Sequence, residues 1–191
     1  DSNNDSVSIY ANVCNYGIID DLNIADGHYG IFLKECTYIS VANADVHGHD
    51  EEALVLDYNA VTLVGCNHIG VLNFQAHDSA VGSTSKGTHS AGASNIRFLN
   101  CNFSGHGGAG MLISIAAGGT TPTNISILNC TLIGNAAIET AAGTVYGIKL
   151  NTLNDVLIAH TTIKDSVSSE VLSAQGLLVA SCEKVYLSNC N

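Results

Sequence analysis

The amino-acid sequence predicts an all-β fold in which the chain winds into a parallel β-solenoid of about seven coils, each with three short strands. Three observations predict it. A short apolar pattern recurs along the chain at intervals of 22 to 31 residues. The composition includes 19 Gly, and charged residues make up only 12% of the chain, which favours strands and turns over exposed helices. Seven cysteines are spread from end to end rather than crowded together.

The recurring pattern has apolar residues at its first, third, sixth and eighth positions. Its fifth position is Asn in five copies, with Asp21 and His160 in the other two. A two-residue period that changes phase at an Asn predicts two strands joined by a tight bend, because Asn tolerates the left-handed backbone conformation. Stacked copies would form an Asn ladder. The copies begin at Gly17, Ile39, Ile69, Ile96, Ile125, Val156 and Val185.

A third strand precedes most copies, and in four cases it begins with glycine. One coil has too little apolar surface to fold alone, so we expect the coils to stack at about 4.8 Å each. Residues 61–66 could form a further strand or a loop insertion, which leaves the number of coils at seven or eight. The predicted third strands are Gly30–Leu33, Ala53–Leu56, Gly110–Ile113, Gly147–Leu150 and Gly176–Val179.

All seven cysteines fall on inward positions of the predicted strands. Buried thiols on successive coils behave as small apolar side chains, and this explains them better than disulfide bridges or a metal site. These cysteines are Cys14, Cys36, Cys66, Cys101, Cys130, Cys182 and Cys190.

Length and charge restrict the classes of function. The 191 residues suit a single domain covering 1–191. A net charge of -11 repels nucleic acids and anionic membrane surfaces, and the sequence holds no apolar stretch long enough to insert into a membrane. Because Val7 enters a strand almost at once and Asn191 stops inside a coil, we expect a fragment of a longer chain or ends sealed by a partner.

The loops that leave the Asn-bearing pattern carry the candidate chemistry. Five of the eight histidines fall in the first four of these loops, and stacking would place them on one edge of the solenoid. At the coil spacing, the carboxylates beside them could reach the separations of roughly 5 to 9.5 Å that hydrolytic pairs use. The histidines are His28, His47, His49, His77 and His106, and the carboxylates are Asp26, Asp50, Glu51, Glu52 and Asp78.

We predict general acid–base catalysis on this edge, with histidines that orient a sugar or tune the carboxylates. The alternative is that polar loops of an acidic protein simply collect Asp, His and Gly. The remaining histidines, His68, His89 and His160, are interpreted as structural. The predicted catalytic residues are Asp26, Asp50, Glu51 and His106. The predicted substrate-binding residues are His28, His47, His49, Glu52, His77, Asp78 and Lys149.

No cofactor is predicted, because the chain lacks a dense ligand motif. Two alternatives stay open. Zinc could use His47, His49 and Asp50 together with His77 and His28 from adjacent coils, and calcium could use the carboxylates.

The rhythm of these strands resembles the right-handed parallel β-helix proteins of the pectin-lyase-like class over nearly the whole chain. The resemblance implies a right-handed fold. It leaves the activity open, because this architecture carries lyases, hydrolases, epimerases, phage tailspikes and adhesins.

A narrower resemblance involves three segments. Gly105-His106-Gly107 is similar to the Gly-His-Gly element of polygalacturonase-like glycoside hydrolases, and residues 50–52 stand where that family places an Asp pair. Lys149 is similar to the lysine of its Arg-x-Lys element, although no Arg precedes it, and the family's Asn-x-Asp is reduced here to Asp26. The resemblance implies hydrolysis of a glycan. Lyases are less favoured, because only Lys164 among the basic residues enters the loops compared here.

Two functions therefore compete. The first is binding or processing of a polysaccharide, by hydrolysis of a neutral or weakly charged glycan if the protein is an enzyme. The second is a non-catalytic shaft of a viral or phage tailspike, surface fibre or adhesin, which as a tailspike would be a homotrimer. Either function implies an extracellular location or the surface of a virion or cell.

Overall fold

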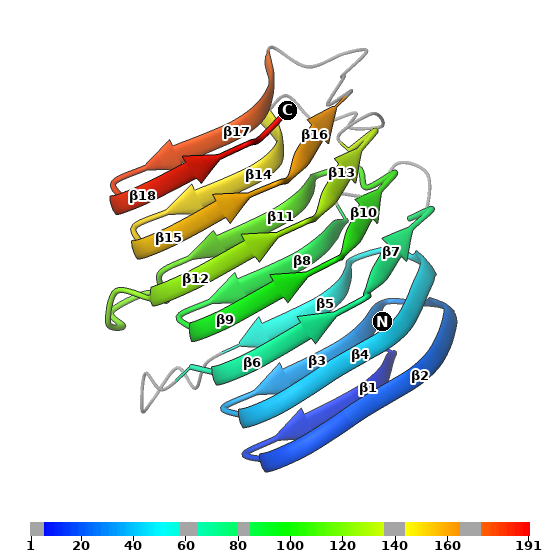
Figure 1. The fold of residues 1–191 in the computed structure, drawn as a ribbon. Coiled ribbons are helices and arrows are strands. Elements are labelled where there is room, and N and C mark those ends of the chain that lie inside the picture. The colour runs from blue at the N-terminus through cyan, green and yellow to red at the C-terminus, as the bar shows by residue number, and fades with distance from the viewer. Residues whose placement is uncertain (1–5, 58–64, 80–84, 136–143, 165–172) are drawn as a thin grey trace.

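The computed structural model describes residues 6–57, 65–79, 85–135, 144–164 and 173–191. They form strands of a parallel β-helix whose seven coils stack from the N-terminal to the C-terminal end (Figure 1). Every strand pairing between coils is parallel and joins residues 22 to 37 apart. The predicted fold is confirmed, including about seven coils with three strand positions each.

One strand of each coil belongs to a seven-stranded sheet, called the A sheet below. Its spatial order follows the order of the chain. Its strands are β1 (Val7–Asn12), β3 (Tyr29–Lys34), β5 (Glu52–Asp57), β8 (Lys86–Ala91), β11 (Ala109–Ser114), β14 (Thr144–Asn151) and β17 (Ser173–Ala180).

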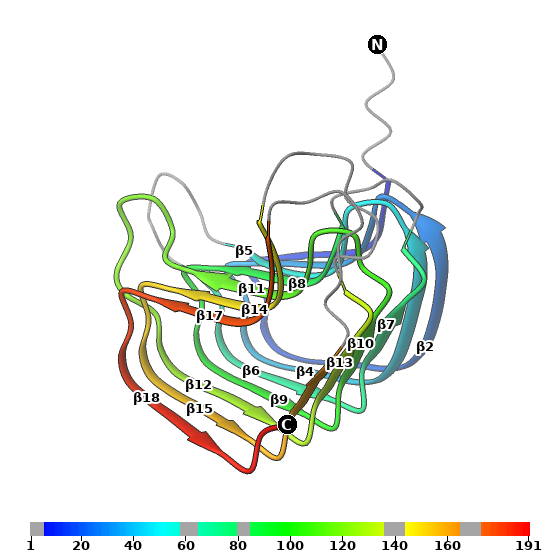
Figure 2. The same ribbon diagram turned by 90° about the horizontal axis from the view of Figure 1, so that it is seen from above.

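The other strands form an eleven-stranded sheet, called the B sheet, which is bent into a long arm and a short arm (Figure 2). In the first two coils one 13-residue strand runs through the bend. The next four coils have a separate strand on each side of it, and the last described coil has one strand, before the bend. The strands are β2 (Asn15–Gly27), β4 (Thr37–His49), β6 (Asn67–Leu72), β7 (Gln75–His77), β9 (Ser94–Leu99), β10 (Asn102–Ser104), β12 (Thr123–Leu128), β13 (Thr131–Ile133), β15 (Asn154–Ala159), β16 (Thr162–Lys164) and β18 (Glu183–Ser188).

The bend between the two arms is the predicted Asn position. In all seven coils its φ angle lies between 49° and 56°, in the left-handed region. The Asn73 amide donates to Asn43 Oδ1 at 3.0 Å, and the Asn100 amide donates to Asn73 Oδ1 at 3.3 Å. The predicted Asn ladder therefore exists, on the outside of the solenoid. The residues at this bend are Asp21, Asn43, Asn73, Asn100, Asn129, His160 and Asn189.

A second ladder lies near the start of the long arm, where a further positive-φ residue occurs in every coil. In the first three coils it consists of stacked rings: Tyr16 and Tyr38 have centroids 4.9 Å apart, and Tyr38 and His68 have centroids 4.6 Å apart. In the next two coils side-chain amides form this ladder: the Asn124 amide donates to Asn95 Oδ1 at 2.8 Å. The interpretation of His68 as a structural residue agrees with this stack.

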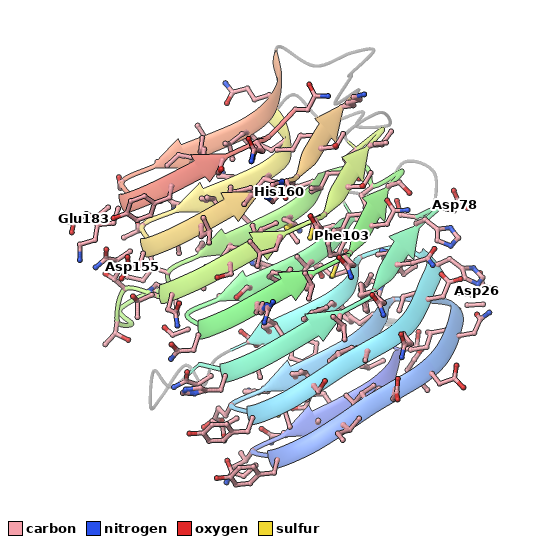
Figure 3. The ribbon with its side chains drawn as sticks, viewed as in Figure 1. Asp26, Asp78, Phe103, Asp155, His160 and Glu183 are labelled. Carbon is pink, nitrogen blue, oxygen red and sulfur yellow. The ribbon has the colours of Figure 1, made fainter. Side chains whose placement is uncertain are left out.

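The core fills the space between the two sheets with aligned apolar side chains. Phe103 lies inside, between the sheets (Figure 3), and is fully buried. This packing explains the glycine that is the second residue of β3, β8 and β11. A Cβ atom at Gly30 would lie 2.5 Å from a Val46 methyl, and one at Gly87 would lie 2.5 Å from the Phe103 ring. Only a very small residue fits where the A sheet approaches the short arm.

The cysteines occupy two inward columns, a column being the set of residues aligned on successive coils. Cys36, Cys66, Cys101 and Cys130 are buried as predicted. Cys14 and Cys190 occupy the same columns on the first and last described coils and are exposed. Burial raises the pKa of the Cys66 thiol to about 12, so it stays protonated. The seven thiols are free, in agreement with the packing interpretation.

Each of the five predicted third strands lies within an A-sheet strand. Strand β8 was not predicted, because its inward residues Thr88 and Ser90 are polar and hide the apolar alternation. Thr88 satisfies its hydroxyl by donating to the Leu54 carbonyl oxygen at 3.1 Å. The alternative for residues 61–66 falls mostly outside the described residues. Helices are absent from the described ranges, so no helix there could cross a bilayer.

The bend predicts a stability difference between two replacements of Asn73. Replacement by Val removes two ladder hydrogen bonds and puts a β-branched residue at a φ of 49°. Replacement by Gly removes the same bonds but keeps the left-handed conformation accessible. We expect Asn73→Val to be the less stable variant by about 1–2 kcal/mol in urea unfolding. Equal stabilities would contradict the assigned role of the bend.

Candidate functional site

The predicted edge lies where the short arm turns toward the A sheet. A third positive-φ position marks this turn in five successive coils, at Asp26, Gly48, Asp78, Gly105 and Gly134. Asp26 and Asp78 lie on this edge and point away from the ribbon (Figure 3). The Asp26 carboxylate lies over Gly48, where an added Cβ would come within 2.5 Å of Asp26 Oδ1.

His28 joins two of the predicted catalytic carboxylates. Its Nδ1 lies 2.6 Å from Asp50 Oδ1, and its Nε2 lies 4.0 Å from Glu51 Oε1. The ring is half-buried, whereas Asp50 is exposed. Two acids that share one imidazole can exchange protons with it and fix its orientation.

His77 forms a second histidine–carboxylate group on the same edge. Its Nε2 lies 2.9 Å from Asp45 Oδ1, and its Nδ1 lies 2.9 Å from Asp78 Oδ2. Partial burial lowers the pKa of His77, but the two carboxylates outweigh that effect and raise it overall. The His47 ring stacks on the His77 ring with centroids 5.3 Å apart, and His47 Nε2 lies 3.2 Å from Asn23 Oδ1. The structure thus brings together three of the five predicted edge histidines at the surface.

His49 and His106 point inward instead. Both are buried, with exposed fractions of 1% and 0%, and their ring centroids are 5.3 Å apart. Burial lowers the pKa of His49 to about 4, and burial next to His49 lowers the pKa of His106 to about 3. His106 Nε2 donates to the Ala76 carbonyl oxygen at 3.1 Å. The structure therefore places these two predicted site residues out of reach of a ligand on the surface.

A second cluster lies beside the edge, on the outward face of the A sheet. An open pocket of about 330 Å³ is hollowed there. Acidic groups, two aromatic rings, a valine and a histidine surround it. Its lining residues are Tyr29, Phe32, Glu51, Glu52, Val55, Asp57 and His89.

The charged groups at this pocket form a triad. Lys86 Nζ lies 2.7 Å from Glu52 Oε1, and His89 Nδ1 lies 3.6 Å from the same oxygen. Burial alone would raise the pKa of the Glu52 carboxyl, but the neighbouring His89 ring and Lys86 ammonium lower it to about 2. Glu52 is consequently a carboxylate at neutral pH, and His89 is the most exposed member of the triad.

Aromatic rings connect the edge to the pocket. His28 meets Tyr29 edge-on with centroids 4.8 Å apart, and Tyr29 meets Phe32 edge-on at 5.7 Å. Phe32, Val55 and His89 are in register on adjacent strands, and Lys149 follows them in the same outward column two strands beyond His89. The Lys149 ammonium lies 4.9 Å from the centre of the Tyr146 ring. The outward face of the A sheet thus carries a track of rings and charged groups, with the aliphatic side chains of Val55 and Leu112 between them.

No metal site emerges from these residues. Within the described ranges, no group of three or more His, Cys, Asp and Glu side chains is arranged to hold a metal ion. The zinc and calcium alternatives rest on the sequence alone.

Sequence reasoning missed Lys86 and His89, because their strand was not predicted and His89 was interpreted as structural. One signal could have found them: Gly87 occupies the glycine position of the A-sheet strands. His89 stands two residues later, at the outward position next to Val55.

The sequence matches a family model described as a right handed beta helix region over residues 2–191, and the chain belongs to this family. No curated protein matches it. Among solved structures it is similar to the A-module of mannuronan C-5 epimerase AlgE4 of Azotobacter vinelandii, with a TM-score of 0.60 and 15% identity over 92% of this chain and 53% of that one. The AlgE6 A-module of the same organism gives a TM-score of 0.53 and 12% identity over 96% and 57%. The chain thus spans little more than half of each module.

The buried histidine pair predicts an acid-sensitive fold. In the unfolded chain these rings titrate near pH 6.5, whereas the folded pKa values are about 4 and about 3. Below pH 6.5 the unfolded state binds protons that the folded state excludes, so the free energy of unfolding falls as the pH drops toward 4. Its slope reaches up to about 1.4 kcal/mol per pH unit for each histidine.

Urea unfolding at several pH values measures this slope. His49→Phe should flatten it relative to the native chain, because it places a ring that cannot be protonated at the same buried position. His160→Gln, at an exposed bend, is the control that should leave the slope unchanged. A His49→Phe slope equal to the native one would contradict the assignment.

The triad predicts a strong coupling between Lys86 and Glu52. Lys86→Met should destabilise the fold by about 3 kcal/mol, because it leaves a buried carboxylate without its counter-charge. Adding Glu52→Gln should restore much of that loss. A double-mutant cycle by chemical denaturation measures the coupling, and additive effects of the two changes would contradict the ion pair.

Proposed function

We propose that this protein binds and processes a polysaccharide, with one sugar unit in the pocket of the A sheet. The observation that carries the proposal is the track on that face, where the rings of Tyr29 and Phe32 adjoin the triad of Glu52, Lys86 and His89. Aromatic faces pack against the C–H faces of sugars, and charged groups beside them fix the hydroxyls.

Charge at the pocket favours a neutral or weakly charged glycan. Three carboxylates, those of Glu51, Glu52 and Asp57, line it, and Lys86 is already paired with Glu52. The net charge of -11 adds a repulsive field against a polyanion. Mannuronan, the uronate polymer for which the similar epimerases are named, is therefore less favoured here than a neutral chain.

The chemistry we propose is hydrolysis of a glycosidic bond by general acid–base catalysis. His89 gives a proton to the leaving oxygen, and the Glu52 carboxylate, 3.6 Å from His89 Nδ1, orients the ring. Glu51 lines the same pocket and takes a proton from the attacking water, while His28 and Asp50 beside it orient the carboxylate. Asp26, Asp78 and Lys149 lie farther along the edge and the track, where they would contact neighbouring sugar units. A polysaccharide substrate also implies action outside the cell or at its surface.

A glycan array combined with a reducing-sugar assay tests the proposal. Glu51→Gln and His89→Phe should each lower the rate of reducing-end release by at least about 100-fold, while Glu51→Gln still binds the glycan. His160→Gln lies on the B sheet and is the matched control with native activity.

Native rates for both pocket variants would overturn the assignment of the site. Binding without any product would overturn hydrolysis and leave recognition as the function of the same pocket. Absence of glycan binding altogether would overturn the proposal as a whole.

A further inference from the structure

A second hollow lies on the outward face of the long arm of the B sheet. The long arm and the A sheet form opposite sides of the solenoid (Figure 2). It is a pocket of about 170 Å³ lined by residues of three adjacent strands, β4, β6 and β9. Those residues are Ser40, Gly70, Val71, Leu72, Arg97 and Leu99.

The hollow exists because one side chain is missing from an outward column. Gly70 is in register with Ser40 on one side and Arg97 on the other. A Cβ atom added at Gly70 would meet nothing within 4 Å, so packing does not require glycine here. Gly70 differs in this from Gly30 and Gly87, where neighbouring atoms leave no room for a Cβ.

Arg97, the only arginine of the chain, forms one wall of the hollow. No carboxylate in the described part of the chain forms an ion pair with it, whereas Lys86 is paired with Glu52 and Lys149 lies over Tyr146. Its in-register neighbours Gly70 and Ser126 are uncharged. An exposed guanidinium without a counter-charge is therefore available in a protein with a net charge of -11.

The chemistry of the walls identifies the ligand. A guanidinium presents paired N–H donors that match the two oxygens of a carboxylate. Leu72 and Leu99 are in register two residues further along β6 and β9, and they give the hollow an apolar wall. Ser40 adds a hydroxyl on the opposite side. A ligand that contacts Arg97, the leucine wall and Ser40 must therefore carry one carboxylate, one apolar face and hydroxyl groups.

We infer that this hollow is a second carbohydrate site, which binds a single carboxylate-bearing sugar. The carboxylate pairs with Arg97, the C–H face of the ring packs on Leu72 and Leu99, and a hydroxyl bonds Ser40. The site lies on the other sheet from the pocket of the proposed function and does not depend on it. The field of the acidic chain favours an isolated acidic sugar over a polyanion.

The experiment is an NMR titration of the ¹⁵N-labelled protein with methyl β-glucuronide and with methyl β-glucoside. These sugars differ only in a carboxylate and a hydroxymethyl group. The glucuronide should shift the backbone signals of Ser40 and Gly70 and the side-chain signal of Arg97, and it should bind at least about tenfold more tightly than the glucoside.

Four variants separate the contributions. Gly70→Val, whose Cβ would meet no atom within 4 Å, fills the hollow and should abolish binding. Ser126→Val, on the other flank of Arg97, should leave binding native. Arg97→Gln should lower the affinity for the glucuronide by at least about tenfold, and Arg97→Lys, which keeps the charge without the fork, by less. Thermal unfolding should confirm that all four variants fold.

Three outcomes would overturn the inference. These are equal affinity for the two sugars, native binding by Gly70→Val, or binding of acetate as tight as that of the glucuronide, which would indicate a simple anion contact. The variant His89→Phe serves as a cross-check: loss of glucuronide binding there would assign the sugar to the A-sheet pocket instead.

Discussion

The whole structure depends on one constraint, which is that successive coils stay in register so that every strand bonds its neighbour above and below. Register holds because each coil bends at the same places, at residues that accept a left-handed backbone. Asn, Asp and Gly occupy many of these bends, and Tyr16, Tyr38 and His68 occupy others, where their rings stack on one another. Side chains 22 to 37 residues apart in the sequence thereby become neighbours.

The same bends decide which side chains face the core. His47 and His49 are two residues apart, and in an unbroken strand both would point the same way. Gly48 lies between them with a φ of 70° and changes the phase, so that His47 is at the surface while His49 is buried. Gly105 has the same effect on His106. The histidines of the edge are thus divided by backbone geometry into a group that can meet a ligand and a pair that cannot.

The sequence allowed a good prediction of the fold and a partial one of the site. The Asn-centred repeat and the leading glycines located nearly all the strands, because both follow from backbone conformation and packing. Strand β8 was not predicted, because polar Thr88 and Ser90 stand at its inward positions in place of apolar side chains. His89 on the same strand was therefore interpreted as structural and not as a residue of the site. The inward orientation of His49 and His106 was not predicted, because a pattern of residue types does not show where the alternation of inward and outward side chains changes phase. The ion pair of Glu52 with Lys86 joins residues 34 apart. Because the loops between the strands vary in length, the sequence alone does not give the register that brings these two residues together.

The ring stack of Tyr16, Tyr38 and His68 is confined to the first three coils, and the chain contains no tryptophan. Tyrosine fluorescence is therefore not masked by energy transfer to an indole. Stacking gives the phenol rings of Tyr16 and Tyr38 an environment that differs from that of the other tyrosines. The N-terminal end of the solenoid consequently carries its own optical reporter. Its fluorescence lifetime would reveal whether the helix frays from that end or melts as one cooperative unit.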